Sequence, residues 1–247
     1  MKIIPTVLIS LLAMALFACG GGGGGGGSNT APPAATAPPT PPAPPPPVVS
    51  TNTFNVLSGY KLLNAQGATV RLNISGSCAG SFLLVGGAAT TVTTFEGKPA
   101  LSASEVVSES FSNCTPVSSI TTTTRYFDSN YLPVGFVVQG SSYGVYSFTP
   151  NIPAAAKVGD TALFGNIDLY TDATKSSKSG YAQLSYTIEA DTASTAIANL
   201  TERQFNAQNV LIVTVQNRYR VKADNSLALF SIDVQYANGS TVHLIFS

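Results

Sequence analysis

Apolar and polar residues alternate with a period of two through much of the chain from Thr53 onward, and this pattern restricts the fold more than any other feature. The clearest case lies between Ala182 and Ile188, where every even position is apolar and the odd positions between them are polar. Because successive side chains of a strand point to opposite faces, such a segment buries one face and exposes the other. Segments of this kind are typical of antiparallel sheets.

Gly, Asn, Asp and Pro separate the alternating segments, which predicts many short strands joined by turns. We expect strands at 69–75, 81–85, 90–95, 119–127, 135–139, 145–149, 162–170, 181–189, 195–201, 210–221, 228–236 and 241–246. Residues 100–111 are ambiguous, because their valines with Glu105 and Glu109 could form a helix, but the serines favour a strand. The expected fold is all-β: an antiparallel meander that forms a partly closed barrel or a sandwich.

The last two expected strands flank Asn238-Gly239, a strong hairpin signal. A two-residue loop would mix polar and apolar residues on both faces. A three-residue loop, 237–239 with Gly239 in the left-handed conformation, gives one wholly apolar face, so we predict that register. It also places Asp233 opposite His243 on the polar face. The apolar pairs that it predicts are Val234–Val242, Ile232–Leu244 and Phe230–Phe246.

The first 18 residues have the layout of a secretory signal peptide. Lys2 supplies a positive charge, Ile3 to Phe17 form an apolar run, and Ala18 is a small residue suited to cleavage. The run is about fifteen residues long, whereas a helix that spans a bilayer needs roughly 20. We therefore predict a signal peptide at 1–18 rather than a retained membrane helix.

The segment Leu16-Phe17-Ala18-Cys19 resembles the lipobox of bacterial lipoproteins. Leu16, Ala18 and Cys19 match that motif, whereas Phe17 is bulkier than the residue usually found there, and the resemblance covers residues 1–19 alone. It implies that Cys19 carries a diacylglycerol and that its new amino terminus carries a fatty acid such as palmitate. Two or three acyl chains give a lasting membrane anchor. Gly20, rather than Asp, implies delivery to the outer membrane.

Low-complexity sequence follows the cysteine. Residues 20–27 are all glycine, and ten of the sixteen prolines lie between Pro32 and Pro47. Such a segment has nothing to pack, so we expect residues 19–49 to form a disordered linker. Residues 50–247 are then the exported β-rich domain, with a possible subdivision near 126–150.

Composition excludes some partners. Twelve basic and twelve acidic residues cancel, and charged residues make up 10% of the chain, so there is no electrostatic basis for binding nucleic acid. Cys78 and Cys114 remain once Cys19 is acylated, and a pair of cysteines in an exported protein predicts a disulfide. Two thiols without a nearby histidine do not make a zinc site, and we expect no metal or other cofactor.

Candidate catalytic groups are few. His243 is the only histidine, and with Asp233 it could supply two members of a hydrolase triad, but no Gly-x-Ser-x-Gly motif is present. Two carboxylate pairs, Glu189/Asp191 and Asp168/Asp172, could serve glycoside hydrolysis, yet their places at strand ends favour turn roles. The arginines that could share one polar face as a small basic patch are Arg203, Arg218 and Arg220.

These observations favour a lipid-anchored envelope protein that binds a ligand or a partner protein without catalysis, and they identify neither the ligand nor an oligomeric state. The domain would face the periplasm or the cell exterior. One alternative is an envelope hydrolase that uses carboxylates or the Asp233/His243 pair, and another is a structural or adhesion module. An interior cavity with apolar walls would favour binding, a cleft with converging carboxylates would favour catalysis, and a long exposed edge strand would favour adhesion.

Overall fold

The computed structural model describes residues 50–247, which form one helix and thirteen strands. The elements are α1 (Val56–Gln66), β1 (Ala68–Gly76), β2 (Gly80–Gly86), β3 (Thr91–Phe95), β4 (Lys98–Phe111), β5 (Ser118–Phe127), β6 (Pro133–Val138), β7 (Ser142–Tyr146), β8 (Thr161–Tyr170), β9 (Lys178–Ala190), β10 (Ala196–Asn206), β11 (Leu211–Val221), β12 (Leu227–Tyr236) and β13 (Thr241–Phe246). Residues 1–49, with Cys19 and the expected linker, lie outside the described residues.

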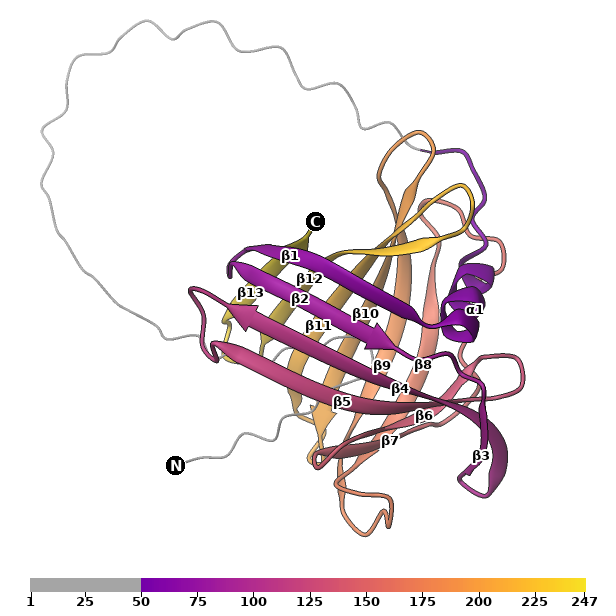
Figure 1. Cartoon of the computed structure of the whole chain (residues 1–247), viewed down its shortest axis with the longest axis vertical. Helices are drawn as coiled ribbons and strands as arrows, with labels where there is room; N and C mark the ends of the chain where they lie inside the picture. Colours follow the sequence, from indigo (N-terminus) through magenta and orange to yellow (C-terminus); the bar gives the residue numbers. More distant parts are fainter. Residues whose placement is uncertain (1–49) are drawn as a thin grey trace, which may run out of the picture.

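Twelve of the strands form a closed antiparallel barrel, shown in Figure 1. From β4 to β13 each strand pairs with the next one along the chain, β13 pairs with β1, β1 pairs with β2, and β2 pairs with β4. The short strand β3 pairs with β4 outside this circle. The predicted antiparallel all-β meander is confirmed, and it forms a barrel rather than a sandwich. Strands β5, β6 and β7, near the possible subdivision at 126–150, belong to the same sheet as the other strands.

Most of the expected strands are present, and two details differ. The ambiguous segment 100–111 lies in β4, so the preference for a strand is confirmed. β7 ends at Tyr146, three residues before the predicted end, and the helix α1 was not predicted. Its start and end have recognisable signals: the Asn55 side chain accepts a hydrogen bond from the Ser58 N–H at 2.9 Å, and Gly67 at the other end has φ +70°.

The register of the last hairpin is confirmed over most of its length. Gly239 has φ +86°, and its N–H donates to the Tyr236 carbonyl at 2.9 Å, which closes the predicted three-residue loop. Two of the three predicted apolar pairs form: Val234–Val242 and Ile232–Leu244.

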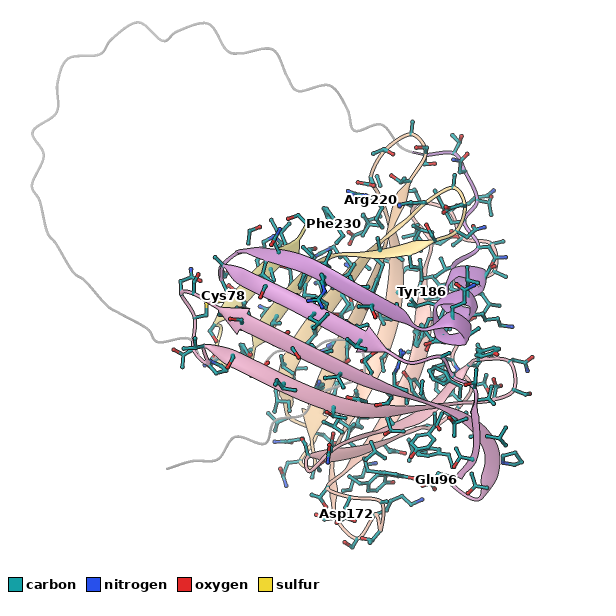
Figure 2. All side chains as sticks on the ribbon, viewed as in Figure 1. Cys78, Glu96, Asp172, Tyr186, Arg220 and Phe230 are labelled. Atoms are coloured by element: carbon teal, nitrogen blue, oxygen red, sulfur yellow. A yellow bond between two sulfur atoms is a disulfide. The ribbon has the colours of Figure 1, made fainter. Side chains whose placement is uncertain are left out.

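The third predicted pair, Phe230–Phe246, is wrong. Phe246 pairs with Ile74 of β1 instead. A register shift between β11 and β12 skips Phe230. The centre of its ring lies 4.6 Å from the Arg220 guanidinium carbon, and both residues are labelled in Figure 2. Bulges of this kind bend a strand, and neither strand's alternation reveals the extra residue.

One end of the barrel, which we call the disulfide end, is filled by apolar side chains from opposite walls. They come from β1, β2 and β4 on one side and from β11, β12 and β13 on the other. Here the Cys78–Cys114 disulfide joins the β1–β2 turn to the β4–β5 turn, which confirms the predicted bond. The largest members of this cluster are Ile74, Phe82, Phe111, Ile232, Leu244 and Phe246.

The other end of the barrel, the helix end, is covered by α1, which lies on the right in Figure 1. The Asn55 N–H donates to the Asn225 side chain at 2.8 Å. A Cβ on Gly59 would lie 2.1 Å from the Asn225 carbonyl oxygen, so only glycine lets the helix pack this closely on the β11–β12 turn. Within residues 50–247 no helix is long and apolar enough to cross a membrane.

Candidate binding cavity inside the barrel

A cavity lies beneath α1 at the helix end of the barrel. The cavity has a volume of about 70 Å³. Its walls come from α1, the segment after β7 and strands β5 and β8–β12. The lining residues are Val56, Tyr60, Leu63, Arg125, Ile152, Pro153, Phe164, Tyr186, Ile188, Ala198, Leu200, Tyr219 and Leu227.

The sequence places these side chains inside through strand alternation. On β10, Ala198 pairs with Ile188 of β9 and with Tyr219 of β11, so the three share the inner face. Leu200 is two residues further along β10 and pairs with Tyr186. The cavity wall is therefore built from a continuous patch of apolar and aromatic side chains.

Arg125 is the one charged side chain in the lining. It belongs to the inner face of β5 because it pairs with Phe136 of β6, which is fully buried. Its residue is 8% exposed, Nη2 lies 3.3 Å from Glu105 Oε2, and the guanidinium carbon lies 5.4 Å from the centre of the Phe127 ring. Nε is buried and has no hydrogen-bond partner. A cationic donor thus faces an otherwise apolar space.

Burial shifts the ionisation of the groups around Arg125. It raises the pKa of Glu105, although the positive charge of Arg125 opposes that rise. Burial also raises the pKa of Tyr60 to about 12 and raises the pKa values of Tyr146 and Tyr219. These three phenols therefore keep their protons at neutral pH and add no charge to the interior.

Buried polar side chains also lie on the inner face outside the lining of the cavity. Gln204 Nε2 donates to Glu202 Oε1 at 2.7 Å, and the side-chain oxygens of Gln204 and Asn217 are buried without a partner. Burial raises the pKa of Glu202 to about 8 and that of Glu109 to about 7. Neither of these carboxyl groups, nor Glu105, lines the cavity. The cavity is apolar apart from Arg125 and the tyrosine hydroxyls.

The structure brings together the pair that the sequence predicted, Asp233 and His243, directly across the last hairpin. The Asp233 carboxylate contacts both the His243 Nδ1 and the Arg218 guanidinium. Arg218 Nε in turn donates to Glu189 at 3.2 Å. Ser77 Oγ accepts a hydrogen bond from the backbone N–H of His243 at 3.0 Å, so this serine is bonded to the backbone rather than to the imidazole ring. The pair belongs to an ion network on the outer face of the barrel.

The other candidate groups also have structural partners. Asp191 accepts from Arg220 Nε at 2.7 Å, and Asp168 accepts from Lys178 at 2.6 Å. Asp172 accepts from the Thr174 backbone N–H at 2.8 Å within a turn. The guanidinium of Arg203 lies over the Phe205 ring at 5.4 Å. Within residues 50–247, no three His, Cys, Asp or Glu side chains are placed to hold a metal ion.

Sequence reasoning missed the cavity residues. In β5 the alternation gave no usable signal, because Arg125 shares its face with Thr123 and Phe127 while the opposite face carries Ile120 and Tyr126. A charged residue that occupies the same alternate positions as the apolar residues of a strand is expected to be buried. Buried charges need partners. On β10 this signal marks Glu202, which follows Ala198 and Leu200 on the inner face.

Comparison of the chain with protein-family profiles, curated proteins and solved structures finds no match.

Proposed function

We propose that this protein binds a small apolar molecule inside its barrel and catalyses no reaction on it. The observation that carries the proposal is the cavity beneath α1, whose lining is apolar and aromatic apart from Arg125. Specific small-molecule sites are typically concave, predominantly apolar and equipped with few polar groups. Apolar cavities that water occupies poorly take up apolar molecules readily.

Binding is favoured over hydrolysis because acid and base groups do not converge on the cavity. Glu105, Glu109 and Glu202 are buried outside its lining, and Asp233 and His243 lie on the opposite face of the barrel wall. Adhesion through an edge strand has weak support, since β3, which pairs with β4 alone, is five residues long.

The proposal includes a lipid anchor at Cys19 in the bacterial outer membrane. The barrel would then lie either in the periplasm or at the cell surface. What supports the anchor is the lipobox-like segment 16–19 after an apolar run. Residues 31–47 are rich in proline, and as a polyproline II helix of about 3.1 Å per residue they would span roughly 50 Å. Such a spacer would hold the barrel clear of the membrane surface.

The test is titration calorimetry with 1-octanol, a neutral apolar probe. We would use the whole chain with Cys19→Ala, which removes the acylation site and leaves residues 50–247 unchanged. The expected result is saturable binding of one molecule per chain, together with a higher melting temperature, because a ligand that binds the folded state stabilises it. Absence of saturable binding would refute the proposal.

Two substitutions locate the site. Ala198→Phe and Leu227→Phe each place a larger side chain in the cavity, from two different walls. Each should therefore fill part of the cavity and abolish octanol binding. Thr201→Phe adds the same ring to the outer face of β10 and should leave binding unchanged. Two variants are used because a ring forced into the interior can prevent folding. If folded Ala198→Phe and Leu227→Phe bind octanol like the Thr201→Phe control, the site is not this cavity.

A further inference from the structure

We infer that the ligand of this cavity is an amphipathic carboxylate whose anionic head binds Arg125 and whose apolar body lies against the walls beneath α1. This inference rests on the proposed function and names its ligand class. Three observations carry it: the place of Arg125 in the lining, its incomplete set of partners, and the absence of other charged side chains from the lining.

Arg125 has hydrogen-bond donors that the protein leaves unused. A guanidinium has five N–H donors. Within the described residues, Arg125 makes one ion-pair contact, with Glu105 at 3.3 Å, and one ring contact, with Phe127. Its Nε is buried and unpaired. Because a buried donor without an acceptor is costly, the free side of this guanidinium is a ready site for acceptor atoms.

The shape of the guanidinium favours a carboxylate as the acceptor. The guanidinium is planar, and a carboxylate can accept two parallel hydrogen bonds from it, which a hydroxyl or a single carbonyl cannot. A head group bound in this way would sit where Arg125 meets the cavity. The rest of the ligand would then contact Ile188, Leu200 and Leu227, which lie on β9, β10 and β12.

A ligand with a cationic or a neutral polar head group fits this site less well. No carboxylate lines the cavity, so an ammonium head would meet Arg125 without a counter-ion. A neutral hydroxyl would accept from one donor of the guanidinium, whereas a carboxylate can accept from two. Glu105 competes with an incoming carboxylate for Arg125, and this competition can be tested, because Glu105 itself is not in the lining.

The experiment compares octanoate with 1-octanol, which have chains of the same length and differ in the head group. In calorimetry at neutral pH on the whole chain with Cys19→Ala, octanoate should bind about tenfold or more tightly than octanol, the factor expected for a charge-assisted hydrogen bond. The double variant Arg125→Met/Glu105→Gln removes both charges. It should weaken octanoate by about 10- to 100-fold and change octanol binding by less than about threefold.

Two further variants complete the design. Glu105→Gln removes the competitor and should tighten octanoate binding, which also decides the question if the double variant does not fold. Arg203→Met is the matched control, because Arg203 lies over an aromatic ring on the outer face of β10, and it should change nothing.

The outcomes separate this inference from the proposed function. If octanol binds at the cavity but octanoate binds no more tightly, or if octanoate binding is unchanged in the double variant, the inference is overturned and the proposed function stands. A Glu105→Gln variant with unchanged or weaker octanoate binding also overturns it. If octanol shows no saturable binding, the proposed function fails, and the inference that rests on it fails with it.

Discussion

Arg125 and Glu105 form an ion pair inside the barrel, with Nη2 and Oε2 3.3 Å apart, and the pair lies next to an apolar cavity. Both residues are more than nine-tenths buried. Desolvation of two charges is costly, and a contact of this length offsets that cost only in part. The interior of this barrel therefore keeps a charge pair that packing alone does not require, and the proposed binding of a ligand would account for it.

The ion pair predicts how stability responds to substitution. Arg125→Met leaves Glu105 buried without a counter-ion and should lower the free energy of unfolding by about 3–5 kcal/mol. Arg125→Met/Glu105→Gln leaves no buried charge at this place and should stay within about 2 kcal/mol of the wild type. Urea unfolding followed by circular dichroism measures both. A double variant as unstable as Arg125→Met would show that the loss came from packing rather than from charge.

Loss of the Cys78–Cys114 bond should destabilise the barrel. The bond joins residues separated by 36 positions, and closing a loop of this size contributes about 3.5–4 kcal/mol on the chain-entropy estimate. Reductant should therefore lower the urea midpoint of the wild type. Cys78→Ser/Cys114→Ser is the control, because it should already show the lower midpoint and should not respond to reductant. Identical midpoints in all four samples would contradict the prediction.

The buried carboxyl of Glu202 predicts a pH dependence with a definite sign. Its pKa rises from 4.5 to about 8 in the folded chain because burial disfavours the charged form. Between these values the unfolded chain loses the proton and the folded chain keeps it, so the stability contributed by Glu202 below pH 4.5 is lost as the pH rises to about 8. Glu202→Gln removes this loss, on the order of a few kcal/mol.

Stability measured between about pH 5 and pH 8 checks that sign. The difference between Glu202→Gln and the wild type should grow as the pH rises. Asp172→Asn is the contrasting control, since hydrogen bonds from Thr174 lower the pKa of Asp172 from 3.8 and its titration lies below this window. A Glu202→Gln difference that is constant, or that shrinks with pH, would show that this carboxyl is ionised in the folded state.

The lipid anchor predicts that Cys19→Ala moves the protein out of the detergent phase on Triton X-114 partition. The reason is that this cysteine would carry the acyl chains, and without them no lasting anchor is left. Mass spectrometry of the mature amino-terminal peptide is the direct check, and it should show Cys19 as the first residue with acyl mass attached. A mature chain that begins elsewhere, or an unchanged partition, would refute the anchor.

The sequence allowed the strands and the last hairpin to be predicted because both depend on local information. Alternation identifies the two faces of each strand, and Gly239 sets the loop that pairs Val234 with Val242. Closure of the barrel was beyond this reasoning, since β1 and β13 meet through residues more than 160 positions apart, such as Ile74 and Phe246. No local pattern encodes that pairing.

The cavity was less predictable than the strands for two physical reasons. Its lining comes from α1 and six strands, and the helix that covers it has a short sequence whose caps, Asn55 and Gly67, are common in turns. Arg125 also looks like a solvated charge until the inner face of β5 is known. In contrast, Asp233 and His243 were brought together as predicted, but Arg218 ties them into a surface network.

The most direct test of the central claim is an NMR measurement of contacts between 1-octanol and the methyl groups of the protein. Binding beneath α1 predicts nuclear Overhauser effects from octanol to Ile188, Leu200 and Leu227, which line the cavity on three strands. Effects confined to exposed methyl groups such as those of Val92 and Ile120, which are 80% and 76% exposed, would contradict it.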